Sequence, residues 1–100
     1  WVVVGVEDEK PLPKEFALGQ NYPNPFNPAT TINYQLPVSG KVTLKVYDLL
    51  GNEIATLVNE GKAAGTYNLT WNASQLSSGV YFYRLQAGSF VQTRKMILLK

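Results

Sequence analysis

The run Lys41-Val42-Thr43-Leu44-Lys45-Val46-Tyr47-Asp48 carries the plainest structural signal in the sequence. Val42, Leu44 and Val46 alternate with polar residues, so one face of an extended chain would be apolar and the other polar. A helix would not place these side chains on one face, because its period is about 3.6 residues. The run therefore predicts a β-strand with one buried face.

Other runs along the chain follow the same period of two or are rich in β-branched and aromatic residues. They predict further strands at residues 31–36, 52–58, 66–71, 80–87 and 90–99. Gly, Pro, Asn and Ser separate the runs, and they predict turns at 50–52, 59–61 and 87–89 and a loop at 75–79. Helix signals are almost absent.

Short strands with such punctuation predict an all-β fold. They favour an antiparallel immunoglobulin-like β-sandwich of about seven strands over a small closed barrel. The short turn at 87–89 predicts that the last two strands form a hairpin.

Length and composition suit one small domain with a modest core. The chain has 100 residues, 45% of them hydrophobic, and a net charge of +2 with only 16% charged residues. This balance gives no basic patch for nucleic acid. Cys and His are absent, which removes thiolate chemistry and the commonest general base and metal ligand. No acidic pair forms a hydrolase-like motif, so we expect a non-catalytic module without cofactor or metal.

The ends of the chain indicate a piece of a longer protein. It has no initiator Met and no signal-peptide pattern, and the apolar run 1–6 is too short to span a membrane. Residues 1–14 are expected to be a linker or the tail of a preceding domain, and residues 15–100 the folded domain. The charged, proline-containing stretch 7–14 is typical of an exposed linker.

The stretch GQNYPNPFNPATTI, residues 19–32, fits neither a helix nor a fully paired strand. Its prolines fix their own φ angles and lack a backbone N–H, which predicts an extended strap. The strap residues of interest are Tyr22, Pro23, Asn24, Pro25, Phe26, Asn27 and Pro28. Both aromatic rings are expected to be buried, and the asparagines to close local turns. Such a strap would seal an edge of the sandwich; a proline-rich docking peptide is the alternative.

Two further features admit a structural and a functional interpretation. Asp48 and Asn52 predict a turn at the end of a strand, with a calcium site as the minor alternative. The strand aromatics are more typical of core residues than of a sugar-stacking platform. These aromatics are Trp71, Tyr81, Phe82 and Tyr83.

Several motifs together resemble the type A C-terminal sorting domain of the type IX secretion system, also called the Por secretion system. The matching residues are 18–28, 46–48 with Gly51, 64–65, Trp71, 76–81 and 95–100. The resemblance runs from about residue 12 to residue 100, in the order and spacing of that family. No single fragment would carry it alone.

The resemblance implies an address for export, not an enzymatic activity. Proteins of this kind cross the inner membrane with a signal peptide, fold in the periplasm, and pass the outer membrane through a translocon that recognises the folded domain. A cell-surface sortase usually removes the domain and joins the cargo to anionic lipopolysaccharide, although some cargo is released. The family fold is an immunoglobulin-like sandwich. The implied cargo domain would precede Trp1, and cleavage would fall in the linker.

The resemblance also implies that the end of the chain carries most of the signal. The residues expected to meet the translocon are Arg94, Lys95, Met96, Ile97, Leu98, Leu99 and Lys100. A terminal strand with basic ends could offer backbone pairing and charge to a receptor. The same residues could instead complete the core, with lysines guarding the edge. A homodimer through an edge strand is a further expectation.

A second family motif, residues 78–81, is expected to serve folding. Gly79 would permit a tight turn and Tyr81 would pack inward. Two other functions stay open at this point. One is a carbohydrate-binding module that uses exposed Tyr47, Tyr81 or Tyr83, and the other is a structural immunoglobulin-like spacer.

Overall fold

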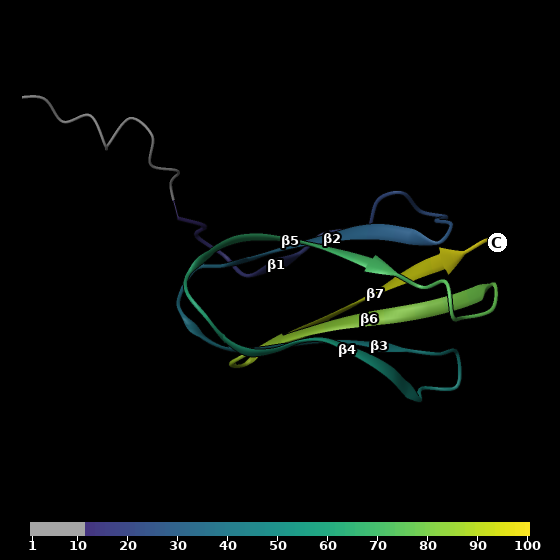
Figure 1. Ribbon diagram of the computed structural model, residues 1–100. Helices are drawn as coiled ribbons and strands as arrows, with labels where there is room; N and C mark the ends of the chain where they lie inside the picture. The colour runs from purple at the N-terminus through teal and green to yellow at the C-terminus, as the bar shows by residue number, and fades with distance from the viewer. Residues whose placement is uncertain (1–11) are drawn as a thin grey trace, which may run out of the picture.

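The computed structural model describes residues 12–100, which form seven strands in two antiparallel sheets (Figure 1). The strands are β1 (Ala17–Leu18), β2 (Ala29–Leu36), β3 (Gly40–Tyr47), β4 (Glu53–Lys62), β5 (Gly65–Asn72), β6 (Gly79–Ala87) and β7 (Phe90–Leu98). The predictions for residues 1–11 lie outside the described residues. The predicted all-β sandwich is confirmed.

The two sheets divide the strands unevenly. One contains β1, β2 and β5 in that order, and the other contains β4, β3, β6 and β7. In constant-type immunoglobulin domains the fourth strand lies instead in the sheet that contains the first, second and fifth strands. Here β4 returns beside β3 because residues 48–52 close a tight turn, in which the Asp48 carboxylate accepts the backbone N–H groups of Leu50 and Asn52, both at 2.9 Å. The predicted turn at 50–52 is therefore confirmed.

The core lies between the inner faces of the two sheets. Alternate residues of β2, β3, β6 and β7 are buried, as the period of two predicts. The fully buried side chains on these strands include Ile32, Leu36, Val42, Leu44, Val46, Tyr83, Leu85, Met96 and Leu98. The β6–β7 hairpin turns at Gly88, whose φ of 60° suits a residue without Cβ.

Three local predictions were wrong or incomplete. The two-residue strand β1 was not predicted, because so short a run has no periodicity to detect. Residues 59–61, predicted as a turn, belong to β4 and pair with β3. Gly79 does not form a tight turn; it is the first residue of β6 and lies opposite Leu98 of β7. Turn-forming residues are tolerated in these places because pairing with a neighbouring strand decides the conformation.

Candidate functional site

The strap, residues 19–28, begins by following β2. The N–H of Gly19 donates to the Asn33 carbonyl at 2.8 Å, continuing the pairing of β1 with β2. Tyr22 and Thr31 then exchange two backbone hydrogen bonds, both 2.9 Å long. The first half of the strap therefore belongs to the edge of the three-stranded sheet.

The second half of the strap crosses to the other sheet and pairs with β7. The N–H of Phe26 donates to the Ile97 carbonyl at 2.9 Å, and the N–H of Leu99 donates to the Phe26 carbonyl at 3.0 Å. The side-chain oxygen of Asn24 accepts the N–H of Ile97 at 2.9 Å. The strap thus occupies backbone groups that an edge strand would otherwise expose. Its predicted role as an edge seal is confirmed for this part of the sandwich.

Further contacts tie the start of the strap to β7. The Gln20 amide donates to the Lys95 carbonyl at 2.9 Å. One residue earlier on β7, the Arg94 guanidinium donates to the Leu18 carbonyl at 2.6 Å. Strap and last strand therefore run side by side in the same direction, as the parallel bridge between Phe26 and Leu98 requires.

A buried polar network fixes the strap from below. The Tyr83 hydroxyl donates to the Gly19 carbonyl at 2.6 Å and accepts the N–H of Asn21 at 2.8 Å. The buried Asn21 amide donates to Thr30 Oγ1 and to the Pro23 carbonyl, at 3.0 and 3.1 Å. Burial raises the pKa of Tyr83, and the N–H of Asn21 partly offsets this rise. Every buried polar group of the network has a partner, so the strap has one defined path.

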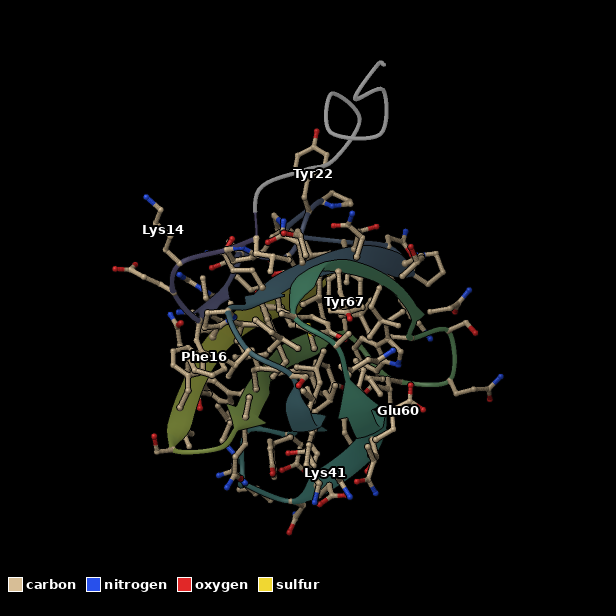
Figure 2. The ribbon with its side chains drawn as sticks, turned by 90° about the vertical axis from the view of Figure 1, so that its left-hand side faces the viewer. Lys14, Phe16, Tyr22, Lys41, Glu60 and Tyr67 are labelled. Carbon is tan, nitrogen blue, oxygen red and sulfur yellow. The ribbon has the colours of Figure 1, made fainter. Side chains whose placement is uncertain are left out.

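The two rings of the strap lie in opposite environments. Phe26 is 2% exposed and packs beside Trp71, with ring centroids 6.1 Å apart. Tyr22 is 80% exposed and stands out from the body of the domain (Figure 2). The prediction that both rings are buried was therefore wrong for Tyr22. Paired residues share a face of a ladder, and Thr31 opposite Tyr22 lies on the outer face, where its hydroxyl contacts Thr70 at 3.2 Å.

The terminal segment, residues 94–100, is divided between the core and the surface. Met96 and Leu98 are fully buried, whereas Lys95 and Lys100 are exposed and Leu99 is 54% exposed. Both predicted roles, core completion and display of basic residues, therefore fit the geometry. At the end of the terminal segment a receptor cannot pair with the backbone, because the strap already bonds the outward N–H and C=O groups of β7.

The family motif at residues 78–81 meets the terminal segment. The N–H of Lys100 donates to Ser78 Oγ at 2.9 Å, and the Lys100 ammonium donates to the Ser74 carbonyl. Tyr81 is buried, as predicted, and its hydroxyl donates to the Ser77 carbonyl at 2.7 Å. This is the arrangement of a tyrosine corner in immunoglobulin-like domains. The strap, this motif and the terminal segment, far apart in sequence, form one continuous region.

Other candidate residues do not form a second site. Tyr81 and Tyr83 are buried, so they cannot stack on a sugar, and Trp71 packs against Phe26. Tyr47 is engaged by the Arg84 guanidinium, which lies 4.8 Å from its ring centroid and donates to its hydroxyl at 2.6 Å. The Asp48 turn uses its carboxylate oxygens on its own backbone and on the Asn52 amide.

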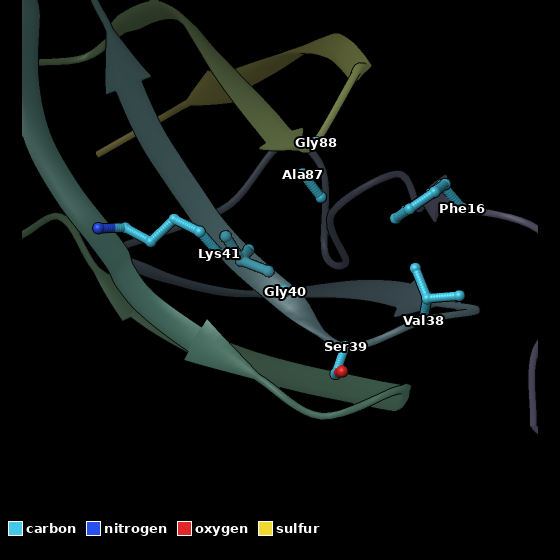
Figure 3. A pocket seen from close by; sticks show the side chains of 8 residues that line it. Phe16, Val38, Ser39, Gly40, Lys41, Ala87 and Gly88 are labelled. Atoms are coloured by element: carbon cyan, nitrogen blue, oxygen red, sulfur yellow. The ribbon is translucent and has the colours of Figure 1, made fainter.

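An apolar hollow of about 160 Å³ lies at the opposite end of the sandwich, beside the β6–β7 turn (Figure 3). Its apolar lining residues are Phe16, Val38, Val42 and Ala87. Ser39 and Lys41 are the polar residues that line it, and the Lys41 side chain extends away from the hollow in Figure 3. It therefore offers no catalytic arrangement.

Sequence reasoning missed the residues that build the network under the strap. Asn21 and Tyr83 are 62 residues apart, and nothing local marks them as partners. Gly19 was also missed: a Cβ at this position would overlap the Asn33 side-chain amide. A polar Gln-Asn pair directly before an aromatic-proline motif was the only available signal.

Within residues 12–100 no helix is long and apolar enough to cross a membrane. Nor do three or more His, Cys, Asp or Glu side chains of these residues gather where they could hold a metal ion.

The fold and the strap together define an immunoglobulin-like β-sandwich whose last strand is clamped by an N-terminal segment. The model of the secretion system C-terminal sorting domain family matches residues 20–99, and the chain belongs to this family. A solved structure of similar fold is that of PorZ, an essential bacterial surface component of the type IX secretion system of Porphyromonas gingivalis. The similarity has a TM-score of 0.54 and 20% identity over 85% of this chain, and it spans 11% of the PorZ chain. No curated protein matches the sequence.

Proposed function

We propose that this chain directs an upstream cargo protein across the outer membrane through the type IX translocon, after export to the periplasm. A cell-surface sortase then cleaves the linker within residues 7–14 and joins the cargo to anionic lipopolysaccharide. Membership of the sorting-domain family, with a match over residues 20–99, supports an address of this kind. The domain itself is non-catalytic, in keeping with a family of sorting signals.

The observation that carries this proposal is the division of the terminal segment. A strand needed only for stability would be expected to turn its apolar residues inward and end there. Here Leu99 is 54% exposed one residue beyond the buried Leu98, between the exposed Lys95 and Lys100. An exposed apolar side chain and basic residues in the same segment can be read by a receptor surface of complementary charge.

The test uses the complete chain fused behind an exported fluorescent reporter in a bacterium that has the type IX system. A deletion of the last residues would remove Met96 and Leu98 from the core, so it would confuse folding with recognition. We therefore choose Lys95→Glu, since the described contact of Lys95 with the strap uses its backbone carbonyl and leaves the side chain exposed.

The matched control is Lys41→Glu. Lys41 is exposed on the same outer face of the same sheet, at the other end of the sandwich. The wild-type and Lys41→Glu fusions should reach the surface or the medium, and the Lys95→Glu fusion should stay folded in the periplasm. Retention of the wild-type fusion would contradict the proposed function, whereas equal export of all three would remove Lys95 from the signal.

A further inference from the structure

The outer face of the three-stranded sheet is polar but carries no charge. Strands β1, β2 and β5 contain no Lys, Arg, Asp or Glu at any position. Buried residues of β2 alternate with outward ones, so its register with β5 sets three cross-strand pairs side by side on the outer face. These pairs are Thr31–Thr70, Asn33–Asn68 and Gln35–Thr66. All six side chains end in a hydroxyl or an amide group.

The other outer face of the sandwich differs in charge. Every strand of the four-stranded sheet contains charged residues, and its outer face displays Lys41, Lys45, Arg84 and Lys95. Exposed faces of soluble domains usually carry charges of both signs, which keep the protein in solution. The lack of charge on one whole face is therefore a feature that the fold itself does not require.

The polar groups of the uncharged face are largely unused by the protein. In the described part of the chain, its six side chains make two hydrogen bonds. One joins the Thr31 and Thr70 hydroxyls at 3.2 Å, and the Gln35 amide donates the other to the Glu15 carbonyl at 3.2 Å. The exposed amides of Asn33 and Asn68 are thus open to a ligand.

One aromatic ring stands on the same face. Tyr22 exchanges two backbone hydrogen bonds with Thr31, and residues paired in this way turn their side chains to the same side. Figure 2 shows the ring projecting beyond the β2 and β5 ribbons, away from the body of the domain. The side chain is 80% exposed, so it contributes little to the stability of the sandwich. Its presence on this face calls for another explanation.

The strap holds both the ring and a neighbouring amide in place. Tyr22 follows Asn21, which the buried network anchors through Thr30 and Tyr83. A tyrosine has only two side-chain torsions, so its ring loses little entropy when it meets a ligand. The Asn33 side chain lies over the strap in the space that Gly19 leaves, since a Cβ at Gly19 would overlap it. The ring and the amide are therefore pre-organised on adjacent chains.

The chemistry of this face matches a neutral sugar chain. A sugar hydroxyl both donates and accepts hydrogen bonds, and so do the side chains of Asn and Thr. The C–H face of a sugar ring is apolar and packs on an aromatic ring. A ligand with carboxylates or phosphates would meet no cation here to offset the loss of their hydration. From Thr31 to Gln35 the face extends about 13 Å along β2, which is long enough for several sugar units.

We propose that the outer face of the three-stranded sheet binds an uncharged polysaccharide, with the Tyr22 ring stacked on a sugar ring and the Asn33 and Asn68 amides bonded to sugar hydroxyls. This inference goes beyond the proposed function and does not depend on it, because the terminal segment belongs to the other sheet. The stacking ring is Tyr22, whereas Tyr81 and Tyr83 are buried and Tyr47 is covered by Arg84.

The test measures binding of the full chain to immobilised polysaccharides by biolayer interferometry in buffer of physiological salt. Glucomannan, xyloglucan and mixed-linkage β-glucan are the neutral probes, and polygalacturonate is the anionic one. The wild type should bind at least one neutral probe and not polygalacturonate. Tyr22→Ala should weaken the binding about tenfold or more, as expected for an aromatic anchor, while Tyr22→Phe keeps the ring and should bind like the wild type.

Two matched controls separate this face from the rest of the surface. Asn68→Ala should weaken the binding about three- to tenfold, the loss of a neutral hydrogen bond, whereas Asn59→Ala removes an exposed asparagine from the other sheet and should have no effect. Leu50, 86% exposed in the β3–β4 turn, controls for Tyr22, and Leu50→Ala should bind like the wild type. All these positions are exposed, so the melting temperature should not change.

Three results would overturn the sugar-binding face. The first is a wild type that binds none of the neutral probes, or Tyr22→Ala and Asn68→Ala variants that both bind like the wild type. The second is binding to polygalacturonate alone, which would assign the ligand to the basic face of the four-stranded sheet. The third is a wild-type dimer in sedimentation that Asn68→Ala converts to a monomer without any glycan binding, which would make a second copy of the chain the occupant. None of these results bears on export by the reporter fusion.

Discussion

The two sides of the sandwich are closed by different means. On the strap side, backbone hydrogen bonds join the strap to β2 and to β7, and the buried Phe26 ring and the Asn21–Tyr83 network add to them. On the crossing side, the chain passes from β4 of one sheet to β5 of the other through residues 63–64 (Figure 1). There the partly buried Tyr67 ring stacks on the buried Tyr34 ring, with centroids 5.2 Å apart, and a Lys62–Glu60 ion pair of 3.0 Å lies at the surface (Tyr67 and Glu60 in Figure 2).

This difference shows where the domain depends on a unique arrangement. Removing a buried ring, or one partner of a buried hydrogen bond, lowers the folding stability strongly. Removing one partner of an exposed ion pair costs little, because water solvates the group that remains. Substitutions at exposed positions of the crossing side should therefore cost little folding stability. The edge strand β4 is protected from edge-to-edge pairing by two register shifts against β3. The strap side combines stability with the display of the residues proposed for recognition.

The largest effect is expected from Phe26→Ala. It removes a buried ring at the point where the strap joins β7, and should lower the free energy of unfolding by about 3–5 kcal/mol. Urea unfolding followed by tryptophan fluorescence measures it, since Trp71 is the neighbour of Phe26. Tyr67→Ala, which removes a half-buried ring on the crossing side, should cost clearly less. Equal losses would abolish the distinction between the two sides.

A smaller loss is expected from Tyr83→Phe. Without the hydroxyl, the Gly19 carbonyl and the Asn21 N–H lose their partner beneath the strap, and the cost should be about 1–3 kcal/mol. Tyr81→Phe is the matched control, because its hydroxyl donates to the carbonyl of the exposed Ser77, where water can replace it. Thermal or urea unfolding of both variants gives the comparison. A larger loss for Tyr81→Phe would contradict the importance of the network.

The ion pair of the crossing side should matter little. Glu60→Gln removes the carboxylate that contacts the Lys62 ammonium at 3.0 Å. In the wild type, the hydrogen bond with this carboxylate raises the pKa of Lys62. Because both groups meet solvent, the urea midpoint should shift only slightly, and added salt should reduce the shift further. A shift as large as that of Tyr83→Phe would show that the crossing side is not tolerant.

The smallest effect is a dependence on pH at the β3–β4 turn. Hydrogen bonds from Asn52 hold the pKa of Asp48 below its ordinary value. Because the folded pKa is the lower one, the carboxylate stabilises the fold above pH of about 4 and loses this contribution as the pH falls through the folded pKa. Asp48→Asn keeps a side-chain acceptor for the turn and should flatten the acid limb of the urea midpoint between pH 2 and 6. An unchanged limb would show that other carboxylates set it.

The sequence alone predicted much of the scaffold and several parts of the site. Period-two alternation located β2, β3 and β5 closely, because alternation depends only on which residues neighbour one another along the chain. Aromatic and β-branched residues located β6. The same local chemistry predicted the Asp48 turn, the last hairpin and the edge-sealing strap. The motifs also pointed to the family that the match over residues 20–99 establishes.

Only the tertiary structure decided how these parts meet. The outward direction of Tyr22 follows from its pairing with Thr31, and the anchoring of Asn21 follows from a hydroxyl 62 residues away. The division of the terminal segment into buried and displayed residues likewise depends on β6 and on the strap, which lie on its two edges. Alternation along a chain specifies that a strand has two faces, but the partner on each edge specifies which backbone groups and side chains stay free. Those partners come from distant parts of the sequence, and the packing of the two sheets brings them together.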